Sequence, residues 1–156
     1  MIYVLYGQPG SGKTTLSKRL AEHINTPYLL DGDEFRTMFN SKGRYGDKIP
    51  GYTPEGRKLN INRVNAVATY IHQQTPDTDV IIACVNPYIE TRCNIAAHNP
   101  GQVRFILLTC NRDLRVCFHV NDFEPGEPDL HIDTDRHWRN NWLALKTLAD
   151  KMKECK

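Results

Sequence analysis

The most constraining feature of this sequence is a glycine-rich octapeptide at residues 7–14, Gly-Gln-Pro-Gly-Ser-Gly-Lys-Thr. It fits the pattern G-x-x-x-x-G-K-[ST], and it lies between an apolar run at residues 2–6 and an amphipathic stretch at residues 12–24. Glycines let such a loop curl so that its backbone N–H groups point at phosphate oxygens, while the helix that follows presents its positive end to the same anion. We interpret the octapeptide as a phosphate-binding loop; the alternative is an accidental glycine-rich turn.

The loop predicts a site for ATP and Mg²⁺. Lys13 is expected to reach the terminal phosphates and to act as a catalytic residue, and Thr14 is expected to bind the Mg²⁺ that bridges the β- and γ-phosphates. The predicted nucleotide-binding residues are Gly7, Gly10, Ser11, Gly12, Lys13, Thr14 and Thr15. The loop alone does not say whether the bound nucleotide is hydrolysed, used as a phosphoryl donor or only sensed.

The rest of the chain alternates short apolar runs with longer amphipathic stretches, which is typical of a parallel sheet with crossover helices. Strands are predicted at residues 2–6, 28–30, 80–85, 103–109 and 130–132. They lack strict alternation because parallel strands are covered on both faces. Helices are predicted at residues 12–24, 34–39, 54–74, 89–98, 113–119 and 136–153. The fold class is therefore α/β, a five-stranded parallel sheet with helices on both faces.

The helix predicted at residues 54–74 has the clearest start. Thr53 can cap its free N–H groups, Pro54 suits the first helical position, and Glu55 complements the positive end of the helix dipole. The predicted buried side consists of Leu59, Val64, Val67, Ala68 and Ile71. In the last helix, Trp138 and Trp142 lie four residues apart and are predicted to anchor it to the sheet.

Composition indicates a single soluble domain over residues 1–156. Hydrophobic residues make up 40% and charged residues 24% of the chain, and a formal net charge of +2 is too small for bulk attraction to nucleic acid or anionic membranes. No apolar run approaches the ~20 residues of a membrane-spanning helix, and the first residues do not resemble a secretory signal. We therefore expect a cytoplasmic protein that does not bind membranes.

Cysteine and histidine usage predicts no further metal site. The five cysteines form no CxxC pair, so neither a disulfide framework nor a zinc ribbon is indicated, and most of them are expected to pack as small hydrophobic residues. The six histidines are scattered, and His72, His98 and His119 are expected to be structural or on helix surfaces.

Two carboxylates follow the second predicted strand, at the sheet edge where open α/β folds bind ligands. Asp33 is the candidate general base for an attacking hydroxyl and a candidate metal ligand, and Asp31 is the candidate for the metal shell or for shaping the loop. The alternative is that Asp33 caps the next helix, because aspartate is a favoured N-cap residue.

Arg57 and Asn60 lie three residues apart in the first turn of the 54–74 helix, on much the same side as its apolar positions. Their functional interpretation is a cationic fork and an amide directed at an anionic substrate. The alternative is a solvated helix end that extends beyond the core.

Taken together, several segments carry a family pattern whose order and spacing extend over most of the chain. They are residues 7–15, LDGDxxR at 30–36, GYTPExRxxNxxR at 51–63, VNPYxxxR at 85–92 and IDTD at 132–135. This pattern resembles the adenylylsulfate (APS) kinase family. The resemblance implies the P-loop kinase fold, and it implies Mg²⁺-dependent transfer of the ATP γ-phosphate to the ribose 3′-hydroxyl of adenylylsulfate, a step of sulfate assimilation.

The resemblance also implies roles for individual residues. Asp33 becomes the base or the metal-side carboxylate, and Arg36, Arg57 and Asn60 become substrate-binding residues. Tyr52 takes the place of an aromatic residue that stacks on the substrate adenine. Asn86 replaces the serine usually found before Pro-Tyr, which keeps a polar group at that position but changes what it can donate.

The sequence departs from the family in two segments. Where the family has an arginine and then a long basic lid with a second aromatic residue, residues 118–129 read FHVNDFEPGEPD and contain no Lys or Arg. Residues 40–52 look longer than in the family and carry Lys42, Arg44 and Lys48. One hypothesis is that this basic loop closes over the transferring phosphate or binds additional phosphates; the alternative is a solvated loop. Phe123 is a candidate aromatic wall for a nucleotide.

Other functions stay open. The loop followed by Asp-x-Asp-x-x-Arg is also similar to polynucleotide 5′-kinases, so a polynucleotide or modified-nucleotide hydroxyl is the alternative acceptor. A non-catalytic ATP-binding sensor is the alternative from another class. The expected partner is a small nucleotide substrate, with nucleic acid not favoured, and the sequence leaves a homodimer open.

Overall fold

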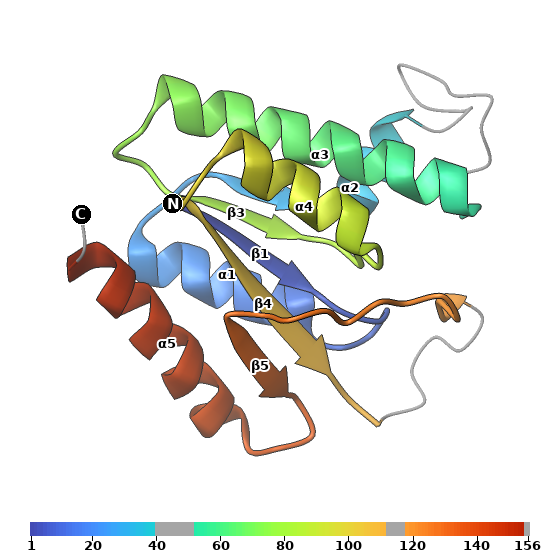
Figure 1. Cartoon of the computed structure of the whole chain (residues 1–156). Helices are drawn as coiled ribbons and strands as arrows, with labels where there is room; N and C mark the ends of the chain where they lie inside the picture. Colours follow the sequence, from blue (N-terminus) through green and yellow to red (C-terminus); the bar gives the residue numbers. More distant parts are fainter. Residues whose placement is uncertain (40–51, 112–117, 155–156) are drawn as a thin grey trace.

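The computed structural model describes residues 1–39, 52–111 and 118–154, which form a parallel sheet between two layers of helices (Figure 1). The strands are β1 (Ile2–Tyr6), β2 (Leu29–Asp31), β3 (Val80–Ala83), β4 (Val103–Thr109) and β5 (Leu130–Asp133). The sheet order is β2-β3-β1-β4-β5, and each neighbouring pair is parallel. The predicted five-stranded parallel α/β fold is confirmed, with strand ends within two residues of those expected.

The helices are α1 (Lys13–Ile24), α2 (Gly32–Phe39), α3 (Pro54–Gln74), α4 (Ile89–His98) and α5 (Trp138–Glu154). Helices α2 and α5 begin two residues away from their predicted starts, and the helix expected at 113–119 falls mostly on residues outside the described ranges. Among the described residues, no helix has both the length and the apolar character needed to cross a membrane.

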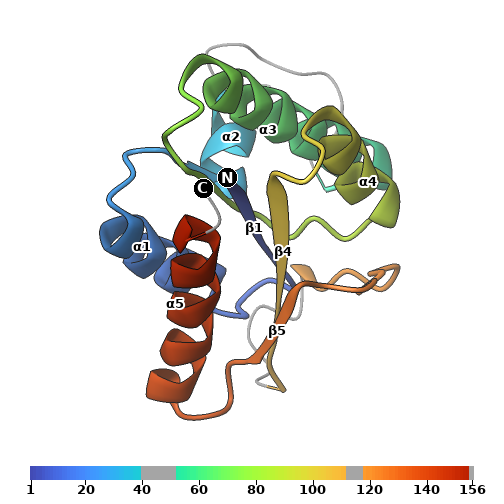
Figure 2. The same cartoon turned by 60° about the vertical axis from the view of Figure 1, so that its left-hand side comes forward.

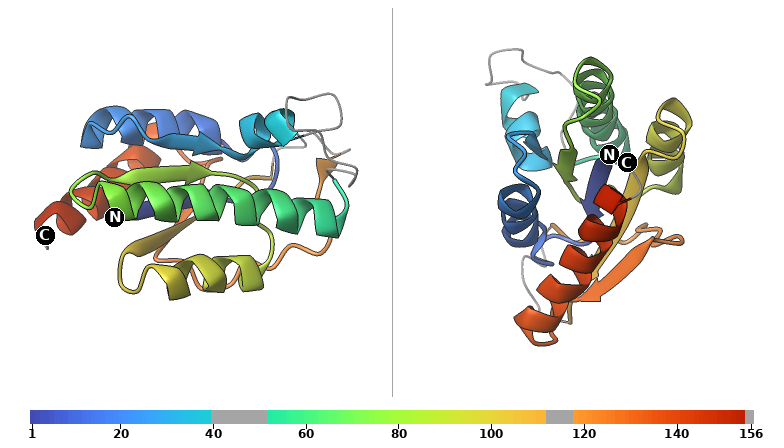
Figure 3. Two further views of the ribbon diagram at one scale, coloured as in Figure 1. Left: turned by 90° about the horizontal axis from the view of Figure 1, so that it is seen from above. Right: turned by 90° about the vertical axis from the view of Figure 1, so that its left-hand side faces the viewer.

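The two faces of β1 explain the layering. Tyr3 and Leu5 pack into one apolar cluster with residues of α1 and α5, whereas Ile2 and Val4 pack into a second cluster with residues of α3 and α4. Figure 2 and the right-hand view of Figure 3 show these helix pairs on opposite sides of the sheet. Because parallel strands in one sheet point the same way, the loops after β1, β2 and β3 meet at one edge.

The start of α3 is as predicted. Thr53 is its N-cap, and the Thr53 hydroxyl accepts a hydrogen bond from the Gly56 N–H at 3.1 Å. The prediction that Val67 is buried is wrong, since 37% of it is exposed. The buried residues of α3 include Ile61, Val64, Asn65, Ala68 and His72, and Val67 lies roughly 100° around the helix from the middle of this stripe.

The two tryptophans of α5 differ. Trp142 packs against the core, as expected for an anchor. Its ring meets the His23 ring edge-on, with 5.6 Å between the ring centroids. The prediction for Trp138 is wrong, because it is 52% exposed at the first position of α5. There the Arg19 guanidinium, 4.6 Å from the ring centroid, covers the ring in place of sheet residues.

The described cysteines and histidines are of mixed burial. Cys84 is buried, as expected of a small hydrophobic residue, whereas Cys93 is exposed and Cys110 is partly exposed; Cys117 and Cys155 lie outside the described residues. His72 is buried in α3, and His98 and His119 are exposed.

Candidate active site

The loop between β1 and α1 has the backbone conformation that its glycines predict. Gly7, Gly10 and Gly12 have φ values of 148°, 85° and 92°. A Cβ atom on Gly7 would lie 2.1 Å from the Leu108 carbonyl oxygen, so no other residue fits against β4 at this position. Ser11 is fully buried beneath the curled loop.

Lys13 lies over this loop. Its Nζ donates hydrogen bonds to the carbonyl oxygens of Gly7 at 2.9 Å and Gln8 at 2.7 Å, and to the Ser11 hydroxyl at 3.3 Å. Burial lowers the pKa of Lys13 to about 8, and the nearby Asp31 and Asp33 carboxylates oppose this shift. The cation is therefore held against the loop where a phosphate would bind.

Asp31, at the end of β2, connects the loop to α2. Its Oδ2 accepts a hydrogen bond from the Thr14 hydroxyl at 3.2 Å, and its Oδ1 accepts one from the Asp33 N–H at 2.8 Å. The alternative in which Asp33 caps the helix is wrong, because α2 begins at Gly32 and Asp31 supplies the capping carboxylate. Asp33 lies in the first turn of α2 and is exposed.

This donor set fits Mg²⁺. A hydroxyl and a carboxylate, both oxygen donors, lie next to each other beside the phosphate loop, and Mg²⁺ typically takes one or two carboxylates together with phosphates and water. The sequence predicted Thr14 with Asp33 as metal ligands, whereas the carboxylate bonded to Thr14 is that of Asp31.

One cavity of about 390 Å³ brings the two halves of the predicted site together. On the loop side it is lined by Gly10, Gly12, Lys13, Thr14 and Thr15. On the other side it is lined by Asp31, Asp33, Arg36, Tyr52, Arg57, Asn60 and Asn86. Gly7 and Ser11 do not line it and instead shape the loop.

Arg36 has unused donors in this cavity. Its guanidinium carbon lies 4.5 Å from the centroid of the Tyr52 ring, and its Nε and Nη1 are buried without a hydrogen-bond partner among the described residues. Burial lowers the pKa of Arg36, while Tyr52 and Asp33 act in the opposite direction. A buried donor without a partner costs free energy that an anionic ligand would recover.

Two buried amides face the same space. The Asn60 Nδ2 donates to the Gly32 carbonyl at 2.9 Å, and its Oδ1 has no partner among the described residues. The Asn86 Oδ1 accepts from the Thr91 hydroxyl at 2.7 Å, and its Nδ2 has no partner among the described residues. Asn60 is only 5% exposed, so the solvated-end alternative does not apply to it. Both residues line the cavity, and each has one buried amide atom without a partner among the described residues.

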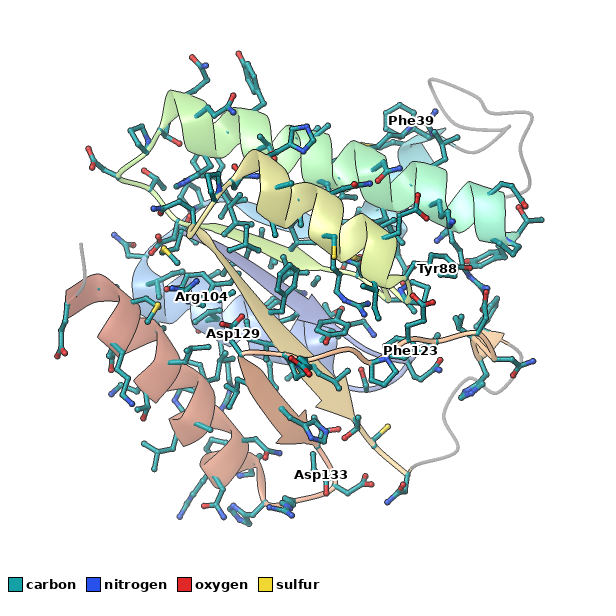
Figure 4. The ribbon with its side chains drawn as sticks, in the orientation of Figure 1. Phe39, Tyr88, Arg104, Phe123, Asp129 and Asp133 are labelled. Carbon is teal, nitrogen blue, oxygen red and sulfur yellow. The ribbon has the colours of Figure 1, made fainter. Side chains whose placement is uncertain are left out.

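Phe118 is a cavity residue that the sequence analysis missed. The centroids of the Phe118 and Tyr52 rings are 5.3 Å apart, and the ring planes make an angle of 39°. Val120 lines the cavity beside Phe118. The predicted wall, Phe123, instead stacks on Tyr6 at 6.2 Å and does not line the cavity. Figure 4 shows the segment from Phe123 to Asp129 crossing over β4. The sequence feature that could have identified Phe118 is its position at the start of residues 118–129, the segment that stands where the family has its basic lid.

The basic loop hypothesis stays a prediction. Lys42, Arg44 and Lys48 fall within residues 40–51, which lie outside the described residues.

The comparison with known families agrees with this arrangement. The sequence model of the family described as adenylylsulphate kinase matches residues 1–123. The chain belongs to the adenylylsulphate kinase family. Similar curated proteins include the adenylate kinases of Chlamydia caviae, 41% identical over 64 residues, and Rickettsia africae, 36% identical over 67 residues. These matches span 41% and 43% of this chain but only 30% and 32% of those proteins.

Solved structures of other family members share the fold. The Mycobacterium tuberculosis APS kinase in complex with AMPPNP and APS has a TM-score of 0.75 at 18% identity, with 96% of each chain covered. A hexameric APS kinase from Thiobacillus denitrificans has a TM-score of 0.65 at 23% identity, covering 98% of this chain and 29% of that one. At these identities the likeness establishes the P-loop kinase fold for this member of the adenylylsulphate kinase family.

Proposed function

We propose that this member of the family transfers the γ-phosphate of ATP to a hydroxyl of a nucleotide-like acceptor, and that the favoured acceptor is the 3′-hydroxyl of adenylylsulfate. The observation that carries the proposal is a cavity lined by a phosphate loop on one side and, on the other, by Arg36, whose Nε and Nη1 are buried without a hydrogen-bond partner among the described residues and whose guanidinium lies against the Tyr52 ring. The phosphate loop suits a nucleoside triphosphate, and the side with Arg36 suits an anionic acceptor that carries an aromatic base.

The donor half of the reaction uses the loop. Its backbone N–H groups and Lys13 bind the β- and γ-phosphates, and Thr14 and Asp31 hold Mg²⁺. When bound, Mg²⁺ neutralises charge that develops on the transferred group. The Lys13 Nζ is bonded to the carbonyl oxygens of Gly7 and Gln8, so it would turn from these to a phosphate bound in the same loop.

The acceptor half uses α2, α3 and the residues after β3. Arg36 and Arg57 bind the anionic groups of the acceptor, Asn60 and Asn86 hydrogen-bond to it, and its base packs between Tyr52 and Phe118. Asp33 accepts the proton of the attacking hydroxyl. A new bond forms between the hydroxyl oxygen and the γ-phosphorus, the bond from that phosphorus to the bridging oxygen breaks, and ADP leaves.

The two rings must separate to admit a base between them. A base in contact with both faces needs a separation of about 7 Å, twice a stacking distance of about 3.5 Å. The ring centroids are 5.3 Å apart, so a shift of Phe118 or Tyr52 accompanies acceptor binding. With the base held between the two rings, the hydroxyl would lie beside the γ-phosphate and water would be excluded.

A panel of acceptors tests the proposal. Incubation of γ-labelled ATP with adenylylsulfate, AMP or a DNA oligonucleotide bearing a 5′-hydroxyl should label adenylylsulfate most efficiently. Asp33→Asn should slow labelling strongly while leaving ADP affinity unchanged. Labelling of the oligonucleotide, with affinity that falls steeply as salt rises, would instead identify a polynucleotide kinase. ADP binding without transfer to any acceptor would identify a nucleotide sensor.

A further inference from the structure

The side chain of Gln8 leaves the phosphate loop and pairs with a segment more than a hundred residues away in the sequence. Its Nε2 donates a hydrogen bond to the Val120 carbonyl oxygen at 2.8 Å, and its Oε1 accepts one from the Val120 N–H at 3.0 Å. The amide therefore satisfies both backbone groups of one residue, as a neighbouring strand would. Val120 is 1% exposed and has no access to water in place of these bonds.

The far end of the 118–129 segment is held by different residues. The Tyr6 hydroxyl donates to the Pro125 carbonyl at 2.5 Å, the Glu124 N–H donates to the Pro87 carbonyl at 2.8 Å, and Arg92 donates to the Glu124 carbonyl. The Glu124 carboxylate also accepts from the Ile89 N–H at 2.6 Å, at the start of α4. These contacts fix residues 124 and 125, whereas the Gln8 pair fixes the end that carries Phe118.

Gln8 also contacts the donor side of the site. Its carbonyl oxygen accepts a hydrogen bond from Lys13 at 2.7 Å, while its side chain holds Val120, two residues from the Phe118 ring. One residue thus connects the lysine of the phosphate loop to the aromatic wall on the acceptor side. A movement of the Val120 backbone would carry the Phe118 ring toward or away from the Tyr52 ring; the two ring centroids are 5.3 Å apart.

We propose that Gln8 is a positioning residue that sets the distance between the phosphate loop and the Phe118 wall, and thereby the affinity for the acceptor. The role of the wall in acceptor binding rests on the function proposed above. The Gln8–Val120 pair holds the backbone two residues from Phe118, so any movement of the Phe118 ring on entry of a base stays confined to its side chain. Fixing the wall in advance reduces the ordering that binding requires.

Gln8→Leu tests this proposal, because it removes both hydrogen bonds at similar side-chain size and leaves the glycines and Lys13 of the loop in place. The KM for the acceptor should rise between about three- and tenfold, while kcat and the KM for ATP stay within about twofold. The matched control is Gln102→Leu, the same substitution at an exposed position before β4, at the opposite edge of the sheet. This control should change none of the three constants.

A double variant separates positioning from a general loss of structure. Phe118→Ala alone should raise the acceptor KM, and adding Gln8→Leu to it should raise the KM no further if Gln8 acts through the wall. Multiplication of the two effects would overturn the proposal.

Hydrogen exchange provides a readout that needs no acceptor. In Gln8→Leu, exchange at residues 118–123 should become at least about tenfold faster, while β1 stays protected and Gln102→Leu matches the parent chain. Unchanged exchange at residues 118–123 would overturn the proposed anchor. If the parent chain labels no acceptor but exchange rises in Gln8→Leu alone, the proposed function fails and the anchor stands.

Discussion

The buried Lys13 ammonium predicts that nucleotide affinity falls as pH rises through about 8. Burial lowers the pKa of Lys13 from 10.5 to about 8 in the free protein. A bound phosphate favours the charged form and raises that pKa again. Binding therefore takes up a proton wherever free Lys13 is partly neutral, and alkaline pH opposes binding.

The expected magnitude follows from the fraction of Lys13 that is charged. With a pKa of about 8, roughly three quarters is charged at pH 7.5 and about a tenth at pH 9. If only the charged form binds phosphate well, the apparent Kd for ADP should rise about eightfold between these two pH values. Proton uptake should be about half a proton per ADP at pH 8.

Calorimetric titration with ADP between pH 7.5 and 9, in two buffers of different ionisation enthalpy, measures both quantities. The matched control is Lys13→Arg, because arginine stays charged throughout this range and its ADP affinity should not change with pH. A flat pH profile for the parent chain, with an enthalpy that does not depend on the buffer, would refute the reasoning.

Three further predictions concern α2 and the basic loop. Gly32→Ala should lower the free energy of unfolding by about 1–3 kcal/mol in urea denaturation, because its Cβ would lie 2.6 Å from the Cys84 Cβ. Cys84→Gly in the same chain should recover part of this loss, and no recovery would contradict the clash. Asp33→Asn should lower kcat by about 10²–10⁴-fold without changing ADP affinity, and a smaller loss in single-turnover assays would exclude it as the base. Turnover should fall far more than thermal stability in a triple alanine variant of Lys42, Arg44 and Lys48, whereas an unchanged rate would remove the basic loop from the mechanism.

The fold and the loop side of the site could be predicted because their signals are local. The glycine pattern at residues 7–14 predicts positive φ angles. Gly7 has a φ of 148°, and it packs against β4 too closely for a side chain. Apolar runs covered on both faces specify buried parallel strands, and β1 and β4 match their predicted limits. Thr53 is a cap in the sequence and in the structure for the same reason, since its hydroxyl reaches an N–H three residues ahead.

The different roles of Asp31 and Asp33 depend on where α2 begins, which is set by packing that the sequence pattern does not predict. Gly32 packs against Cys84 without room for a Cβ atom, and α2 begins at this residue, directly after β2. This early start turns Asp31 into the residue that caps α2 and bonds to Thr14, and it places Asp33 in the first turn. A helix start two residues later, as predicted, would have exchanged these positions.

The aromatic wall was misassigned for a similar reason. Phe118 and Phe123 belong to one segment without Lys or Arg, and the sequence alone does not say which of them faces the nucleotide. Contacts with distant residues decide which phenylalanine lines the cavity. Tyr6 donates a hydrogen bond to Pro125, and Phe123 stacks on the Tyr6 ring. Gln8 holds Val120 beside the cavity.

This anchoring also bears on what the 118–129 segment can contribute to phosphoryl transfer. A cationic lid stabilises charge that develops in the transition state, so its loss lowers kcat. The segment here has no cation to supply, and it lines the cavity with Phe118 and Val120. Among the described residues, the cations that line the cavity are Lys13, Arg36 and Arg57. Substitutions in the segment should therefore change acceptor affinity through shape and stacking alone, whereas substitutions of these cations should change the rate of transfer as well as binding.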